Sequence, residues 1–289
     1  MAATPECGST ARRSSRNIAP VSSDVFARAY DCLIRSDPAA KVAAVESLRD
    51  EWEAGGLALE PRGDVHSDLS PGRPARPVLV SPRAVERRSV STPEGRAALI
   101  HALAHIEFNA INLALDAVYR FRGLPRAYYG DWIRVAAEEA YHYTLLREHL
   151  VALGCDYGSF SAHNGLWEMA VKTAHDPLVR MALVPRVLEA RGLDASPAIT
   201  AKLRACGDRR AVEIMAIIQR DEIGHVAVGN RWYKYLCAQR GLDPIATFKQ
   251  LLQEYDGPRL RPPFHKEARR DAGFSEAELE LIEALAAES

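Results

Sequence analysis

Two copies of one short pattern contain residue types that bind metal ions. The first copy is Glu139 followed by His142, and the second is Glu222 followed by His225. On a helix, Glu and His three residues apart lie about one turn apart on the same face, so both side chains can contact one cation. The sequence therefore predicts a pair of related half-sites.

A lone Glu precedes each copy in an apolar stretch. Glu107 lies 32 residues before Glu139, and Glu189 lies 33 residues before Glu222. This order is typical of a carboxylate-bridged dinuclear metal centre inside a four-helix bundle. We expect the metal ligands to be these four glutamates with His142 and His225.

The charges of this ligand set indicate which metals it suits. Two divalent ions would cancel the charge of four carboxylates, which would otherwise repel one another when buried. Mixed oxygen and imidazole ligands suit iron or manganese, and the pattern offers no thiolate. We expect two iron ions, with manganese as the alternative, and dioxygen or peroxide as co-substrate at the open coordination positions.

Three neighbouring side chains are candidates for supporting roles. Glu138 and Asp221 each lie four residues before a histidine of the pattern, so each can accept a hydrogen bond from the remote imidazole N–H. The alternative is that each acid faces another helix or an arginine. Tyr143 should lie near the metal face, where filling the core is favoured over bonding a ligand or relaying a radical.

Chance is the alternative explanation of the pattern, because acids make up 38 of the 289 residues. However, only two of the nine histidines have a Glu three residues before them, and both lie in long amphipathic stretches. His105 is two residues from Glu107 and should point away from it on a helix. The others, His101, His149, His163 and His175, are expected at the surface or as hydrogen-bonded core residues.

Capping residues, apolar periodicity and the order of the acids predict an all-α fold, a four-helix bundle with additional N- and C-terminal helices. Thr92-Pro93-Glu94 should begin the first bundle helix, and Ser275 with Glu278 forms a capping box. The third bundle helix should break at Asp194–Pro197 beside the site. The expected parts are a disordered tail (1–20), a helical pair with an extended wrapping segment (21–91), the bundle with the dinuclear site (92–241) and C-terminal helices packed on the bundle (242–289).

Composition limits the classes of function. A net charge of −1 and a pI of about 6.8 give no general electrostatic reason for a nucleic acid partner. Five scattered cysteines without a CxxC motif suit a reducing cytoplasm. We find no apolar stretch of about 18 residues and no secretory signal, so we expect a cytoplasmic protein without a membrane span.

Four stretches resemble a family of uncharacterised bacterial ferritin-like proteins that is formally a domain of unknown function. They are TPEGRAA (92–98), ALAHIEFNAINL (102–113), RDEIGHV (220–226) and EARRDAGF (267–274), and the resemblance spans roughly residues 22–285. It implies a ferritin-like fold with the six residues named above as metal ligands. It implies no particular reaction, since ferritin-like proteins include hydroxylases, ferroxidases, peroxidases and radical enzymes.

Three functions remain open at this stage. The first is a dioxygen-activating oxidoreductase or hydroxylase of a small organic molecule, served by an external electron donor, with the added segments 20–91 and 243–289 building the substrate pocket. The second is a ferroxidase or peroxide-scavenging, iron-handling protein. The third is a helical scaffold without metal. We favour the first and expect a monomer or small homo-oligomer.

Overall fold

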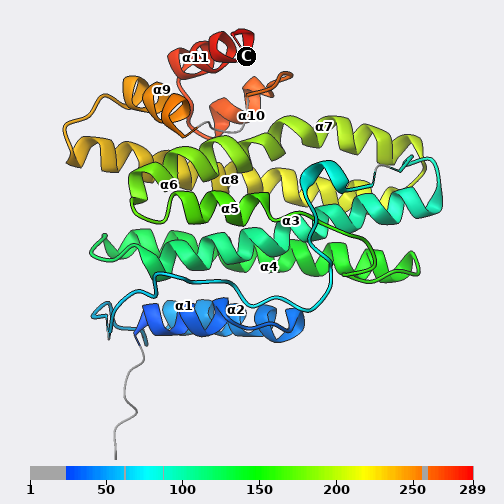
Figure 1. Cartoon of the computed structure of the whole chain (residues 1–289), viewed down its shortest axis with the longest axis horizontal. Helices are drawn as coiled ribbons and strands as arrows, with labels where there is room; N and C mark the ends of the chain where they lie inside the picture. The colour runs from blue at the N-terminus through cyan, green and yellow to red at the C-terminus, as the bar shows by residue number, and fades with distance from the viewer. Residues whose placement is uncertain (1–23, 62, 87, 256–259, 289) are drawn as a thin grey trace, which may run out of the picture.

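The computed structural model describes residues 24–288 apart from 62, 87 and 256–259 (Figure 1). Within these residues the chain is all-helical and contains no β-strand, as predicted. The predicted tail, residues 1–20, lies outside the described part. The helices are α1 (Val25–Leu33), α2 (Pro38–Glu53), the 3-10 turn η1 (Pro82–Ala84), α3 (Pro93–Arg120), α4 (Arg126–Ala152), α5 (Gly165–Lys172), α6 (Pro177–Leu183), the π-helical turn η2 (Val184–Glu189), α7 (Ala190–Ala205), α8 (Arg209–Gln239), α9 (Pro244–Glu254), α10 (Lys266–Asp271) and α11 (Glu276–Ala287).

Local capping signals place the helix starts. Thr92 Oγ1 accepts a hydrogen bond from the Gly95 N–H at 3.0 Å, which satisfies one of the free donors at the start of α3. The predicted capping box of α11 is present, with Ser275 and Glu278 each binding the other's backbone N–H. These caps explain why the starts of both helices were predictable from sequence.

The centre of the molecule consists of four rods: α3, α4, α8 and a composite rod made of α6, η2 and α7. Gly123, with a φ of +76°, sits in the short turn between α3 and α4, where a left-handed residue costs glycine little. The short turn makes α3 and α4 antiparallel neighbours, while α8 packs against α4 and along the composite rod. Figure 1 shows α1 and α2 on one side of these rods and α9–α11 on the opposite side.

A buried lysine ties the N-terminal pair to the bundle. Lys41 of α2 is fully buried and donates to the Leu33 carbonyl at 2.8 Å, to the Gly72 carbonyl at 3.0 Å and to the Asn112 side chain of α3. Burial lowers the pKa of Lys41 to about 7. The three oxygen acceptors compensate the loss of water around this amine.

Residues 57–91 lead from α2 to α3 and contain no helix other than η1 in their described part. An isolated parallel bridge joins Leu79 to Ala162 in the loop that precedes α5. Farther along, Cys206 at the end of α7 lies 3.4 Å from the Val90 carbonyl. The segment therefore connects the N-terminal pair to the α5 and α7 region.

Buried arginines fasten the C-terminal helices to the composite rod. The Arg186 guanidinium of η2 donates to Asn230 on α8 at 2.6 Å and to Glu278 on α11 at 2.9 Å. Arg269 of α10 forms a second buried pair with Asp194 of α7 at 2.7 Å. Breaking a buried pair leaves an uncompensated charge, so these contacts hold α10 and α11 in place.

In the described part of the chain, α3 is the one helix long and apolar enough to cross a membrane by length and composition. The sequence reading had identified no such stretch. Of its most apolar 18-residue window, 78% is buried inside the protein. Such burial fits the core helix of a soluble protein.

The contact between α8 and η2 yields a stability prediction. A Cβ at Gly229 would overlap the Pro185 ring, so we expect Gly229→Ala to lower the free energy of unfolding by about 1–3 kcal/mol. Urea denaturation of metal-free protein measures the change. Gly224→Ala is the matched control on the same helix, because a Cβ there meets no atom within 4 Å. The free energy of unfolding of that control should rise by up to about 1 kcal/mol, because alanine favours helix more than glycine does. An equal decrease in both variants would contradict the contact between Gly229 and Pro185.

Candidate metal centre

The predicted ligands come from four rods and converge on the inside of the bundle. Ligand-type atoms of Glu107, Glu139, His142 and Glu222 all lie within 4.8 Å of one another. His225 adjoins this group through Glu139, and Glu189 lines the same cavity. The contributing elements are α3 for Glu107, α4 for Glu139 and His142, η2 for Glu189, and α8 for Glu222 and His225.

Glu139 lies between the two histidines. Its Oε2 is 3.4 Å from His142 Nδ1, and its Oε1 is 3.0 Å from His225 Nδ1. Each histidine also faces a second carboxylate, with His142 Nδ1 3.4 Å from Glu107 and His225 Nδ1 3.6 Å from Glu222. The cluster thus has two halves, and one carboxylate is shared between them.

Many of the cluster's buried polar atoms have no hydrogen-bond partner among the described residues. A buried polar atom without a partner costs free energy, and several in one place are unusual for a folded protein. Divalent cations would satisfy all of them at once, so the donor set fits a metal site. These atoms are Glu107 Oε2, both Glu139 carboxylate oxygens, His142 Nδ1, Glu189 Oε2, Glu222 Oε2 and His225 Nδ1.

The pKa shifts within the cluster also fit a metal site. Burial, reinforced by neighbouring glutamates, raises the pKa of Glu189 to about 8 and raises those of Glu107 and Glu222. Burial opposes the charged form of His142, but contacts with Glu107 and Glu139 outweigh it and raise the His142 pKa to about 11. Protons therefore balance the charge without metal, and metal binding would displace them.

The acids expected to support the histidines do so across the bundle rather than along one helix. His142 Nε2 lies 3.1 Å from Asp221 on α8, and His225 Nε2 lies 2.8 Å from Glu138 on α4. The sequence reading had paired each acid with the histidine of its own helix, and this pairing is wrong. Both rings point into the bundle, so the remote nitrogen of each reaches the facing helix. A carboxylate at Nε2 fixes the tautomer with a free Nδ1, the atom that faces the cluster.

The predicted break at Asp194–Pro197 is absent, because α7 runs through Pro197. Asp194 does not cap a helix; its carboxylate binds Arg269 and the His265 N–H. The irregular backbone lies earlier, in η2, which contains Pro185 and ends at Glu189. Proline cannot donate the regular helical hydrogen bond, and a wider π turn accommodates it.

Tyr143 occupies an aromatic cluster beside the site. Its ring centroid lies 5.3 Å from that of Phe108 and 5.3 Å from that of Tyr157. Its buried hydroxyl has no hydrogen-bond partner among the described residues. His105, also nearby, bonds the Tyr157 hydroxyl at 2.8 Å and the His163 carbonyl at 3.0 Å. His105 is therefore a buried, hydrogen-bonded histidine.

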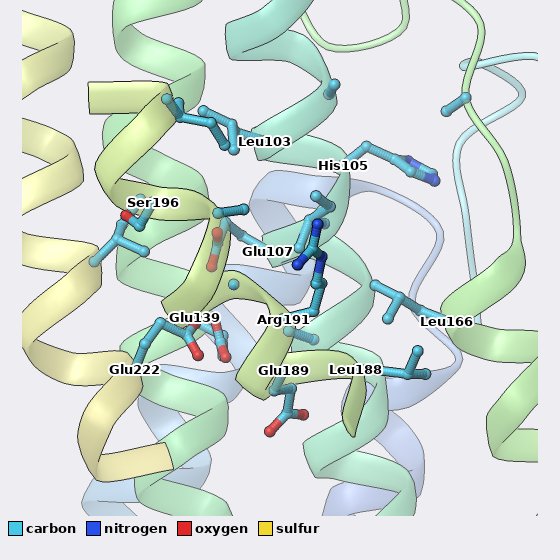
Figure 2. Close-up of a pocket in the computed structure, with 18 of the residues that line it drawn as sticks. Leu103, His105, Glu107, Glu139, Leu166, Leu188, Glu189, Arg191, Ser196 and Glu222 are labelled. Atoms are coloured by element: carbon cyan, nitrogen blue, oxygen red, sulfur yellow. The ribbon is translucent and has the colours of Figure 1, made fainter. Parts of the chain in front are cut away.

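A cavity of about 350 Å³ adjoins the carboxylates (Figure 2). Its walls are mostly apolar, and every acidic residue in its described lining is one of the four candidate ligands. Of the described residues in the two segments outside the bundle, 20–91 and 243–289, Val85 of the first segment reaches the cavity. The remaining outer wall includes the loop at His163 and Leu166 of α5. No described residue of 243–289 lines the cavity, so the expectation that the C-terminal segment builds the pocket does not hold for its described residues.

Sequence reasoning missed four polar residues of the cavity wall: Ser161, Arg191, Ser196 and Gln219. Gln219 lies three residues before Glu222 on α8, a spacing that places both on one helix face. That signal was available in the sequence. Arg191 and Ser196 gave no comparable signal: Ser196 lies in the predicted break at Asp194–Pro197, and Arg191 lies just before it.

The fold and the cluster define an all-helical protein with a buried carboxylate and histidine site. The chain belongs to the family described as "Protein of unknown function (DUF455)", whose match covers residues 34–280. It is also similar to an uncharacterised protein of Haemophilus influenzae, with 52% identity over 216 residues, covering 72% of this chain and 75% of that protein. No solved structure matches the chain.

The cross-helix pairing predicts a loss of metal affinity in Asp221→Ala. Removing the carboxylate frees the His142 ring and its tautomer, so affinity for Mn(II) should fall about 10–100-fold. Competition with a chromophoric chelator measures it. Glu213→Ala, an exposed acid on the same helix, is the control. Unchanged affinity in Asp221→Ala would show that this carboxylate does not orient a ligand.

Glu189 yields a prediction about pH in chelator-treated protein. Its pKa rises from an ordinary 4.5 to about 8 on folding, so between these values only the folded state holds the proton. Stability therefore falls as pH rises through this window, by up to about 1.4 kcal/mol per pH unit. Glu189→Gln removes the effect, and its advantage over wild type in urea denaturation should be larger at pH 8.5 than at pH 5.5.

A pH-independent difference between Glu189→Gln and wild type would contradict the assigned environment of Glu189. The exposed Glu148→Gln on α4 is the control, because its carboxylate is solvated in both states. That variant should follow the wild-type pH profile.

Proposed function

We propose that this protein is a ferritin-like, dinuclear metalloprotein that uses two iron ions and dioxygen to oxidise a small organic molecule. Support for the metal comes from the unpartnered carboxylate and imidazole atoms that converge from four rods. Support for an organic substrate comes from the apolar cavity, whose inner end is formed by the same carboxylates. The contact between cavity and cluster is the observation that carries the proposal.

The ligand set determines the proposed metal. Glu107 and His142 would serve one ion and Glu222 and His225 the other, with Glu139 shared because its two oxygens face different histidines. Glu189 would complete the set from the cavity wall. Four carboxylates and two neutral imidazoles balance two divalent ions, and this oxygen and nitrogen ligation favours iron, with manganese as the alternative.

When bound, a pair of ferrous ions supplies two electrons to dioxygen. The chain's own residues bind and orient the reactants. Asp221 and Glu138 hold the imidazole rings, and the apolar cavity wall excludes water and positions the substrate beside the carboxylates. Repeated turnover requires an external electron donor. The four described cysteines are free thiols, which supports a reducing cytoplasm as the place of action.

Metal analysis and dioxygen uptake test the proposal. Protein reconstituted anaerobically with Fe(II) should hold about two iron ions per chain by mass spectrometry. Glu139→Ala should hold less than one, because the shared ligand is lost. His175→Ala, a change at an exposed histidine outside the cluster, should match wild type. A wild-type protein that binds no Fe(II) or Mn(II) would overturn the proposal.

Dioxygen uptake by the reduced protein separates the proposed oxidation from iron handling. Host extracts fractionated by size and polarity should contain a compound that accelerates uptake and is itself oxidised. Uptake that stops once the iron is oxidised, whichever fraction is added, would instead indicate a ferroxidase.

A further inference from the structure

The lining of the cavity leaves one charge unbalanced once the metal site is filled. In the part of the lining that the structure describes, the acidic residues are Glu107, Glu139, Glu189 and Glu222, all of them proposed ligands. Two divalent ions neutralise these four carboxylates. The Arg191 guanidinium then remains as the permanently charged group of the wall, because arginine stays protonated in proteins.

Arg191 has no carboxylate partner among the described residues. Its one hydrogen bond there goes to the Arg261 carbonyl at 2.6 Å, an uncharged acceptor that leaves other guanidinium donors available. Figure 2 shows its guanidinium pointing away from the Glu189 carboxylate, although only one residue separates them in sequence. An exposed guanidinium at the edge of an apolar cavity is a natural position for the anionic end of a ligand.

A second observation indicates that the wall serves a ligand rather than internal packing. Ser196 is only 5% exposed, yet its hydroxyl has no hydrogen-bond partner among the described residues. Gln219 Oε1 is likewise buried without a partner. Both residues line the cavity. Unpartnered polar atoms are costly in a finished core but are expected where a bound molecule supplies the missing contacts.

We propose that the cavity binds an amphiphilic organic acid, with its anionic group at Arg191 and its apolar body beside the carboxylate cluster. The inference rests on the proposed function, because it takes the four glutamates as neutralised by metal. A volume of about 350 Å³ suits a molecule with an apolar body of small to medium size. In this arrangement Arg191 determines specificity for charge, while the apolar wall determines size.

Decanoate and 1-decanol form a suitable probe pair, since they share a chain and differ in charge. Binding is measured by isothermal titration calorimetry on anaerobic, Mn(II)-loaded protein, with metal content determined on the same sample. We expect decanoate to bind about fivefold to tenfold more tightly than 1-decanol, the range for a hydrogen bond to a charged group that is partly exposed. Arg191→Gln should abolish that preference, and Arg191→Lys should keep most of it.

Two further variants separate charge recognition from structural effects. Gly192→Trp adds bulk at a lining position where a Cβ meets no atom within 4 Å, so it should fold and weaken both probes equally. Arg204→Gln removes an exposed arginine of α7 that is outside the lining and should change neither affinity. A merely structural role of Arg191 would alter both affinities and leave their ratio intact.

Equal affinity for the two probes, or no binding of decanoate, would overturn the inference. If metal is bound in that sample, the proposed function stands and only the substrate class is wrong. If no metal binds, the proposed function fails, and the inference fails with it because the glutamates are not neutralised. Tighter binding of decanoate that disappears in Arg191→Gln is the supporting result.

Discussion

The structure depends on one electrostatic constraint, the placement of four carboxylates and two imidazoles in a space shielded from water. Such groups repel one another or lose hydration, so the fold must supply protons or cations to balance them. Without metal, protons supply this balance. The pKa of Glu189 rises to about 8 and that of His142 to about 11, so both groups hold a proton at neutral pH. Divalent ions do the same without leaving polar atoms unpaired. Each rod contributes a residue to this balance, so the geometry of the site depends on how the four rods pack together.

Several features around the cluster serve this balance. The pairs His142–Asp221 and His225–Glu138 each cross from α4 to α8, so the same contacts that orient the rings also fix the spacing of the two helices. The π turn η2 brings Glu189 to the cavity wall, and Gly229 leaves room for the proline that this turn contains. A regular helix at η2 would rotate Glu189 relative to α8, since each inserted residue changes the face that a side chain occupies.

The sequence predicted features that depend on residues close together in the chain, and it missed features that depend on contacts between distant segments. Helix starts rest on local caps such as Thr92, and the Glu-x-x-His spacing fixes which residues share a helix face, so both could be read directly. The partner of Glu138 depends on which helix faces it, and a single sequence does not specify that. Pro185 and Pro197 look equally disruptive along the chain. In the structure Pro185 lies in the irregular turn η2, where Gly229 leaves room for its ring. Pro197 lies within the helix α7, where Asp194 pairs with Arg269. The cavity wall is assembled from α3, α4, α5, η2, α7, α8 and two loops, and no local pattern describes it.

The buried pair between Arg186 and Glu278 has a consequence for how the protein is made. Arg186 lies three residues before Glu189, and its guanidinium is neutralised by a side chain of α11. In a nascent chain η2 is translated about 90 residues before α11. Until then the η2 turn would enclose an unpaired cation, so it cannot adopt its final form. The η2 turn, and Glu189 at its end, therefore reach their final places only after α11 has emerged, so the carboxylate cluster is completed by a helix that contributes no residue to it.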